Sequence, residues 1–353
     1  MNIPEHRKAI DHLDAQIVKL LNDRTRHVLQ IGEIKLKAGE EIYAPHREQA
    51  VFNRLGKINE GPITNGSLRA IYREIMSSAL SLEKSMTIAY LGPEATFTHQ
   101  AAIQKFGASL RYAAQKTIAD VFSEVSKSAA DYGVVPVENS TEGVVTHTLD
   151  MFVESDLKIV AQIILKIEQC LLSRFRKEQI QRFYIHPQTL AQCRLWLQKN
   201  FPNAEVIETS SNARSAEFAA KEKNSGAIAG VLAAEKYHVP ILDHGVQDNS
   251  ANATRFLVLG RQCSPATGKD RTSLMISIAH EVGALHSALS AFRRFKLNMT
   301  KIESRPSKRK AWEYFFFVDC DGHRTDRKVA SAIAHLEKEC NFVKVLGSYP
   351  NTE

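Results

Sequence analysis

The sequence predicts a multidomain protein with three parts: an all-α three-helix domain over residues 1–85, a two-lobed α/β domain over residues 86–262, and a βαββαβ domain over residues 271–353. Three observations lead to this prediction. The first part shows only helical periodicity, the second alternates strand-like with helix-like stretches, and the third follows the order strand, helix, strand, strand, helix, strand. At about 100–200 residues per domain, a chain of 353 residues has room for two or three domains.

Composition and charge narrow the class of protein. Hydrophobic residues make up 44% and charged residues 24% of the chain, and no apolar run reaches the roughly 18 residues of a membrane span. The first residues carry charges where a secretory signal has an apolar core, so we expect a soluble cytoplasmic protein with no membrane partner. Five scattered cysteines without a CxxC pair argue against a disulfide framework and a zinc site. The net charge of +7 is dispersed apart from the short basic cluster at residues 308–310, so we expect no nucleic-acid partner.

The first part is predicted to contain one very long helix. Apolar residues recur at spacings of three and four over residues 10–31, and Gly39 marks a plausible end. The helix would span roughly 35 residues and about 50 Å. Two shorter helices are expected over residues 45–57 and 67–84. They cannot cover so long an apolar stripe, so we expect an intertwined dimer.

Cations share the inward face of this long helix. Arg7, Arg24 and Lys35 fall at spacings compatible with the apolar stripe. Any one of them could extend to the surface, but several on one buried face are costly unless paired and therefore indicate an anion pocket. Arginine forks suit carboxylates, so a small dicarboxylate is the expected ligand.

The same residues resemble the all-α chorismate mutase family. The resemblance rests on Arg7, on LDAQIVKLLNDR ending in Arg24, on Lys35, on HRE at residues 46–48, and on REIMSSALSLE ending in Glu83. This family rearranges chorismate to prephenate without a nucleophile or a proton transfer, so the site has to hold the compact conformer and stabilise charge on the ether oxygen.

The resemblance implies roles for these residues. Arg7 of the partner chain and Arg24 would bind the two carboxylates, and Lys35 would donate to the ether oxygen. Arg47 and Glu48 would order the ring hydroxyl and the second helix. Glu83 stands where many members have glutamine and can donate to the ether oxygen only when protonated. Ala44 and Ala79 replace an aspartate and a serine of some members, which leaves a weakened mutase open.

In the second part, four loops place Ser, Thr or Asn where a helix can start. N-capping explains any one of them, but four together indicate a shared anion site. There is no GxGxxG and no GxxxxGK[ST] pattern, so nothing supports nucleotide binding. The histidines show no HExxH spacing, and we expect no metal.

This part resembles prephenate dehydratase through LGPEATFTHQAA, VVPVENSTEG, HPQTLAQC and the triplet TRF at residues 254–256. The resemblance implies a two-lobed fold like that of periplasmic binding proteins, and the conversion of prephenate to phenylpyruvate. Thr254 would be the leading catalytic residue, as a hydrogen-bond donor or relay to the departing hydroxyl. Arg255 would bind a carboxylate and Phe256 would pack against the ring. Further candidates for the lining of the cleft are Glu138, Asn139, Ser140, Thr141, Thr209 and Ser210.

The third part follows a linker at residues 262–270 and has the ferredoxin-like strand order. It resembles the phenylalanine-binding ACT domain through GAL at residues 283–285, ESRP at residues 303–306 and KVLGSYP at residues 344–350. Phenylalanine would then bind at this domain and inhibit the dehydratase. The implied binding residues are Gly283, Ala284, Leu285, Glu303, Ser304, Arg305 and Pro306, the last four across a dimer interface.

Together these resemblances imply an enzyme of phenylalanine biosynthesis with mutase and dehydratase activities and feedback by phenylalanine. Neither reaction needs an electron sink or a Lewis acid, so no metal or organic cofactor is implied. A homodimer or homotetramer is expected. Three alternatives stay open: an arogenate dehydratase, a dehydratase with a degenerate mutase domain, and a non-catalytic amino-acid sensor.

Overall fold

The structure, a computed structural model, describes residues 2–307 and 313–352, so the basic cluster at residues 308–310 lies outside the described residues. The chain forms two compact units. The first contains Met1–Thr87 with Lys105–Arg111, and the second contains Ile88–Gln104 with Tyr112–Glu353. Among the described residues, no helix is both long and apolar enough to cross a membrane.

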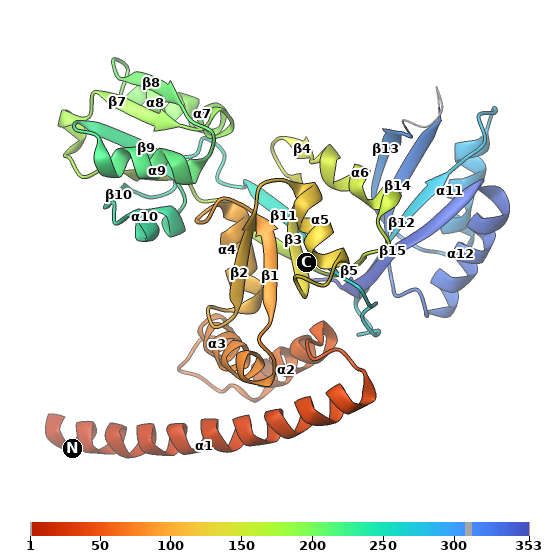
Figure 1. Ribbon diagram of the computed structural model, residues 1–353, viewed down its shortest axis with the longest axis horizontal. Coiled ribbons are helices and arrows are strands. Elements are labelled where there is room, and N and C mark those ends of the chain that lie inside the picture. Colours follow the sequence, from red (N-terminus) through yellow and green to blue (C-terminus); the bar gives the residue numbers. More distant parts are fainter. Residues whose placement is uncertain (1, 308–312, 353) are drawn as a thin grey trace. The chain divides into compact units, whose positions relative to one another are not determined.

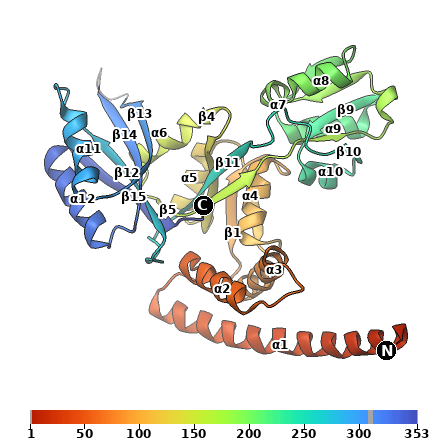
Figure 2. The same ribbon diagram turned by 180° about the vertical axis from the view of Figure 1, so that it is seen from behind.

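Three helices build most of the first unit, as predicted: α1 (Ile3–Ala38), α2 (Pro45–Ile58) and α3 (Asn65–Glu83). α1 begins at a capping box, in which Asn2 and Glu5 each accept a hydrogen bond from the other's backbone N–H, and it ends at Gly39 with a φ of 69°. Figures 1 and 2 show α1 extending well past α2 and α3 toward its N-terminus. Among the described residues of α1 only Gly32 is buried, so most of its apolar stripe is uncovered in a single chain.

The first lobe of the second unit is built on a six-stranded sheet of order β2-β1-β3-β11-β5, with β4 paired to β3. β1 and β3 are parallel, whereas β11 runs antiparallel to β3 and β5. The elements of this lobe are β1 (Thr87–Leu91), α4 (Phe97–Phe106), β2 (Arg111–Gln115), α5 (Ile118–Ser126), β3 (Tyr132–Asn139), β4 (Gly143–Val144), α6 (Thr146–Glu154), β5 (Lys158–Lys166) and β11 (Ala253–Gly260).

The second lobe has a five-stranded sheet of order β10-β6-β9-β7-β8. The chain enters this lobe after β5 and returns to the first lobe through β11, and the two lobes are visible in Figure 1. Its elements are β6 (Cys170–Leu172), a 3-10 turn (Lys177–Gln179), β7 (Arg182–Ile185), α7 (Pro187–Gln192), α8 (Arg194–Asn200), β8 (Glu205–Glu208), α9 (Asn212–Lys221), β9 (Ser225–Ala229), α10 (Val231–Tyr237) and β10 (Ile241–Asp243).

The predicted two-lobed α/β fold is therefore confirmed. Strands are predicted from the sequence at residues 87–91, 132–137, 157–165, 183–185, 205–208, 227–229 and 255–259, and each is present with ends within two residues. β2, β4, β6 and β10 were not predicted. β4, β6 and β10 span only two or three residues, which is too short for an alternating pattern to distinguish a strand from a loop. β2 spans five residues, as many as β1, so its length does not explain why it was missed.

The predicted βαββαβ domain is also confirmed. Its antiparallel sheet has the order β13-β14-β12-β15, and one face of the sheet forms a core with the two helices. The elements are β12 (Asp270–Ser277), α11 (Ala284–Arg294), β13 (Met299–Pro306), β14 (Tyr314–Asp321), α12 (Arg327–Glu339) and β15 (Phe342–Pro350).

The other face of this sheet packs on the first lobe of the same unit. Phe317 and Leu346 share a buried cluster with Phe152 of α6. A Cβ at Gly347 would lie 2.2 Å from the carbonyl oxygen of Ile159, so β15 and β5 approach closer than any larger residue would allow. Because the two domains share one core, a displacement of the sheet is transmitted to the lobe.

Candidate functional site

The cations predicted on α1 occupy two different places. Arg24 and Lys35 both act electrostatically on Glu83 of α3, and Lys35 Nζ also donates to the carbonyl oxygen of Ile42 at 2.9 Å. Arg7 is exposed near the other end of α1, about 25 Å from Arg24 at about 1.5 Å of helix rise per residue. Arg7 therefore cannot join Arg24 at one site within a single chain.

Glu83 lies directly against α1. A Cβ at Gly32 would be 2.7 Å from Glu83 Oε2, so the carboxyl group occupies space that only glycine leaves on this helix face. Burial raises the pKa of Glu83, and the charges of Lys35 and Arg24 oppose the shift. A raised pKa favours the protonated carboxyl group, which is the form that can donate a hydrogen bond to a ligand oxygen.

Two buried nitrogen atoms beside these residues lack a partner among the described residues, namely Arg24 Nη1 and His46 Nδ1. Burial lowers the pKa of His46, and Lys35 and Arg47 lower it further. An unpaired buried donor costs about 1–3 kcal/mol, and a ligand carboxylate is the acceptor that an arginine prefers. The arrangement therefore suits an anionic ligand at Arg24.

Glu48, at the start of α2, is engaged by protein groups. Lys105 Nζ lies 2.6 Å from Glu48 Oε2, and the hydroxyl of Tyr43 donates to the same oxygen at 3.1 Å. Arg47 beside it is exposed. Lys105 comes from α4, outside the predicted helical domain, so no motif of residues 1–85 could have indicated it.

In the second unit, Thr254 lies at the start of β11, and its Oγ1 accepts a 2.7 Å hydrogen bond from Asn139 Nδ2. The same amide donates to Asn252 Oδ1 at 2.8 Å, while Asn139 Oδ1 accepts from the backbone N–H groups of Thr141 at 2.9 Å and Glu142 at 3.2 Å. These four bonds allow the amide only one orientation. In it Thr254 is an acceptor, so its own proton is left to be donated elsewhere.

Side chains of the second lobe complete this cluster. Asn252 Nδ2 donates to Gln192 Oε1 at 3.0 Å, Gln192 Nε2 donates to Glu142 Oε1 at 2.5 Å, and Gln188 also binds Glu142. Gln188 and Gln192 lie on α7, so these bonds join the two lobes beside Thr254. They were not predicted as site residues, although they lie within the HPQTLAQC segment, and Glu142 lies within VVPVENSTEG.

The remaining predicted hydroxyl residues are divided between the lobes. Ser140 Oγ accepts from the backbone N–H of Ala253 at 3.0 Å, directly beside Thr254. Thr209 and Ser210 lie in the second lobe between β8 and α9, and Thr209 Oγ1 is 2.6 Å from Ser215 Oγ. The structure thus brings together Asn139, Ser140, Thr141 and Thr254, and it places residues 209–210 in the other lobe.

Arg255 points to the opposite face of the sheet from Thr254. Its side chain is 6% exposed, Nη1 donates to Asp319 Oδ2 at 2.7 Å, and Nη2 donates to Tyr349 Oη at 2.8 Å. Burial acts to lower the pKa of Arg255, but Tyr349 and Asp319 outweigh it and hold the pKa above its ordinary value. This placement differs from the expectation that Arg255 binds a substrate carboxylate, because successive residues of a strand point to opposite faces.

Glu138 and Phe256 also differ from expectation. Glu138 is ion-paired with Lys301 of β13, on the face of the sheet that Arg255 occupies. Phe256 is only 2% exposed and belongs to the interior of the lobe. The ion pair of Glu138 was not predicted, because a sequence does not tell which face of a sheet covered on both sides a residue takes.

The two segments predicted to bind phenylalanine lie at the start of α11 and on β13. Gly283 precedes α11 with a φ of 86°, a conformation that favours glycine, and a Cβ there would meet no atom within 4 Å. β13 is an edge strand of its sheet. On it, Ser304 and Pro306 are exposed, whereas Arg305 donates from Nε and Nη2 to the two carboxylate oxygens of Asp150, at 3.1 Å each.

Within the described residues one group of side chains has the geometry of a metal site: Glu168, Cys170 and His244, whose ligand atoms lie within 4.8 Å of one another. Burial, and after it the charge of Glu168, raise the pKa of the Cys170 thiol to about 11. Glu168 and His244 are exposed, and exposed groups of this kind are common without an ion, so the group carries no metal assignment.

The chain resembles known proteins over its whole length. The sequence models that match it are described as chorismate mutase type II (residues 6–84), prephenate dehydratase (residues 88–264) and ACT domain (residues 272–337). A bifunctional chorismate mutase/prephenate dehydratase of Aquifex aeolicus is 48% identical over 99% of this chain and 98% of its own length. One of Neisseria gonorrhoeae with the same name is 44% identical over 98% of this chain and 96% of its own.

Among solved structures, a prephenate dehydratase from Arthrobacter aurescens in complex with L-Phe is similar with a TM-score of 0.70 and 33% identity. The similarity covers 75% of this chain and 90% of that one. A prephenate dehydratase from Staphylococcus aureus is similar with a TM-score of 0.67 and 26% identity, over 75% of this chain and 100% of that one.

Proposed function

Because the chain belongs to the bifunctional chorismate mutase/prephenate dehydratase family, we propose a division of two consecutive reactions among its residues. The chain converts chorismate to prephenate and then prephenate to phenylpyruvate, in phenylalanine biosynthesis, with feedback by phenylalanine at its ACT domain. The domains that carry these functions span residues 1–85, 86–262 and 271–353.

For the mutase, Arg24 binds a carboxylate of chorismate, and Lys35 with protonated Glu83 donates to the ether oxygen on which negative charge develops. The observation that carries this assignment is the buried Arg24 Nη1 without a partner among the described residues, next to Glu83 with its raised pKa. Donors placed in advance where charge develops stabilise the transition state more than the ground state. Arg47 and Glu48, at the start of α2, form one edge of the site.

The mutase site is completed by a second chain. Ile10, Ile17 and Ile31 of α1 are 55%, 52% and 52% exposed in the single chain, on the stripe that also carries Arg7. Two copies of α1 that pack antiparallel bury both stripes and bring Arg7 of one chain toward Arg24 of the other. Burial of apolar area stabilises such a pair by about 25 cal/mol per Å², so a homodimer, or a homotetramer built from it, is the working assembly.

For the dehydratase, Thr254 donates a hydrogen bond to the ring hydroxyl of prephenate as that group leaves, and it relays to that oxygen the proton that the reaction takes up, so the threonine hydroxyl is restored. The observation that carries this assignment is the Asn139 amide, which donates to Thr254 Oγ1 and so directs the threonine proton away from itself. As the C–O bond breaks, the ring carboxylate is lost as carbon dioxide and its electron pair enters the ring, which becomes aromatic. One proton is taken up overall, and it ends in the water that is released.

The lobes close around this site. Glu142 of the first lobe binds Gln188 and Gln192 of the second, and Asn252 binds Gln192 as well. Closure excludes water and fixes the substrate against Thr254. Ser140, Thr141, Thr209 and Ser210 provide further hydroxyl groups for the polar end of the substrate.

Phenylalanine binds at residues 283–285 and 303–306. Backbone groups at the start of α11, where Gly283 adopts a positive φ, hold the amino acid. The exposed edge strand β13 offers Ser304 and Pro306 to a second chain. For phenylalanine to regulate the dehydratase, it has to bind one arrangement of this domain more tightly than another.

The test uses the purified full chain, assayed separately with chorismate, prephenate and arogenate. We expect turnover of chorismate and prephenate, and a Thr254→Ala variant that loses dehydratase rate by about 100-fold or more while its mutase rate is unchanged. A parallel loss of both activities would indicate misfolding and refute the assignment of Thr254. Faster turnover of arogenate than of prephenate would reassign the second substrate.

A further inference from the structure

Thr254 and Asn139 lie on paired strands, and each is followed or preceded in the sequence by a charged residue. In the register of β3 and β11, Thr254 is opposite Asn139 and Arg255 is opposite Glu138. Because successive side chains of a strand point to opposite faces of the sheet, the polar pair faces one side and the charged pair faces the other. The charged pair meets the ACT domain, which is part of the same compact unit.

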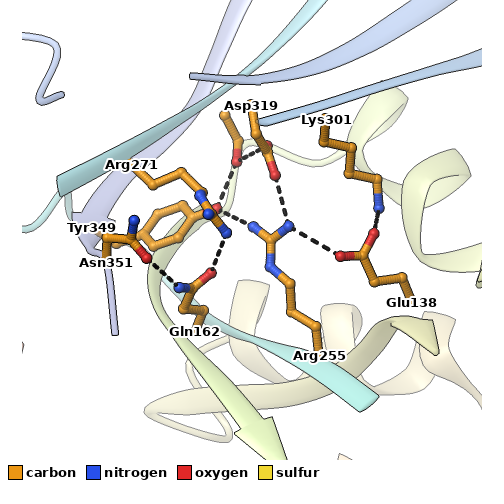
Figure 3. A network of polar contacts seen from close by, with 9 residues as sticks. Glu138, Gln162, Arg255, Arg271, Lys301, Asp319, Tyr349 and Asn351 are labelled. Atoms are coloured by element: carbon orange, nitrogen blue, oxygen red, sulfur yellow. Dashed lines mark hydrogen bonds and ion pairs between the residues drawn. The ribbon is translucent and has the colours of Figure 1, made fainter. Parts of the chain in front are cut away.

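Arg255 is held there by a buried network (Figure 3). Besides the bonds of Arg255 to Asp319 and Tyr349, Ser273 Oγ donates to the other carboxylate oxygen of Asp319 at 2.5 Å. Asp319 is 7% exposed and Tyr349 is 0% exposed. A buried guanidinium depends on its counterion staying in place, so β11 and the ACT sheet cannot shift separately at this point.

Glu138 is held by Lys301, whose ammonium group points at the Glu138 carboxylate in Figure 3. The second oxygen of Glu138 lies 3.5 Å from Arg255 Nη1. Lys301 is 13% exposed and lies on β13, the strand that also carries Glu303 and the rest of the ESRP segment. A displacement of β13 therefore acts directly on Glu138.

We propose that Lys301 and Asp319 are positioning residues for the dehydratase reaction, and that they transmit the state of the phenylalanine site to Thr254. This inference rests on the role proposed above for Thr254. It assigns to the ACT domain a part in holding the catalytic geometry itself, in addition to binding the effector.

Two routes lead from the ACT sheet to the site. One runs from Lys301 through Glu138 to its neighbour Asn139, and the other runs from Asp319 through Arg255 to its neighbour on β11. Both end on the same 2.7 Å hydrogen bond between the amide and the catalytic hydroxyl. A misplacement of about 1 Å at a reacting group costs about 100-fold in rate, so a small shift of β13 and β14 is enough to inhibit.

The chain offers a matched control for Lys301. Lys344 on β15 also reaches from the ACT sheet to the first lobe, where it donates to the carbonyl oxygens of Phe152 at 3.1 Å and Ser155 at 2.8 Å. Its side chain is 16% exposed, close to the value for Lys301. These contacts, and an ion pair with Asp156 at 3.8 Å, lie at and just after the end of α6.

The experiment compares Lys301→Met, Lys301→Arg and Lys344→Met in the full chain, with the dehydratase kcat, the KM for prephenate and the phenylalanine concentration for half-inhibition as readouts. We expect Lys301→Met to lower kcat and to raise the half-inhibition concentration by about fivefold each. The KM should stay within about twofold. Lys301→Arg, which keeps the ion pair with Glu138, should restore both values, and Lys344→Met should leave them unchanged.

Equal effects of the two methionine variants, or no recovery in Lys301→Arg, would overturn the proposal. Its failure is separable from that of the proposed function, because Thr254→Ala tests the catalytic hydroxyl without touching the ACT domain. If Thr254→Ala abolishes dehydratase activity while Lys301→Met behaves like Lys344→Met, the proposed function stands. The positioning role of Lys301 is then refuted.

Discussion

The carboxyl group of Glu83 lies over the backbone of α1 at Gly32, where an added Cβ would be 2.7 Å from Glu83 Oε2. Because Gly32 has no side chain, the side chain of Glu83 can lie directly against α1. It is also where burial raises the pKa of Glu83, next to Arg24 and Lys35.

A Gly32→Ala substitution should therefore displace Glu83 and lower the mutase kcat/KM by about tenfold to 100-fold. Alanine stabilises a helix relative to glycine by about 1 kcal/mol, so unfolding would not explain the loss. Gly56→Ala in α2 is the matched control, since its Cβ would meet its nearest neighbour at 3.8 Å. Mutase rates of both variants, measured with thermal unfolding, check the prediction, and equal rates would contradict it.

The raised pKa of Glu83 predicts the sign of the mutase pH profile. Protonated Glu83 donates to the ether oxygen and the carboxylate does not, so the rate should be highest below the raised pKa and should fall as pH rises through it. Glu83→Gln donates at every pH and should flatten the profile. Rates measured with chorismate from acidic to mildly alkaline pH provide the test, and a wild-type rate independent of pH would remove Glu83 from the reaction.

An Asn139→Asp substitution should reverse the hydrogen bond to Thr254. A carboxylate only accepts, so Thr254 would donate its proton to it and lose that proton for the substrate. Loss of one donor aimed at developing charge costs about 100-fold to 1,000-fold in kcat, or about 3–4 kcal/mol. Steady-state rates with prephenate measure the effect, and the mutase rate of the same protein is the control. A kcat within a few-fold of wild type would argue against Thr254 as donor.

A charged residue on the uncovered apolar stripe of α1 should lower the mutase activity and leave the dehydratase activity unchanged. Ile17 is 52% exposed in the single chain, so Ile17→Glu costs little there, but it would bury a carboxylate in the proposed dimer. We expect weaker association of α1 pairs by sedimentation and loss of mutase rate, with the dehydratase rate retained. Leu195→Glu, at a residue that is 63% exposed in the second lobe, should change neither. Unchanged mutase activity in Ile17→Glu would contradict a site shared between chains.

Most of the secondary structure could be predicted because it depends on local pattern. The apolar spacing along α1 and the strand-like and helix-like stretches after residue 270 each depend on residues only a few positions apart. The short strands β4, β6 and β10 could not be predicted, because their pairing partners rather than their own residues make them strands.

The site shows the same division. Thr254 and Asn139 were indicated by motif and do meet, at 2.7 Å. Arg255 was indicated by the same TRF triplet as Thr254, yet it binds Asp319 in another domain. The contact of Lys105 with Glu48 had no sequence signal, because nothing local relates the two residues.

By itself, the sequence determined the three-part organisation, the type of each domain and the chemical groups available for each reaction. Only the tertiary structure decided which of those groups meet, and on which face of the central sheet. The physical reason is range: apolar periodicity and turn preferences act over a few neighbouring residues, whereas the partner of a charged side chain is set by strand register and by whatever distant segment packs on that face.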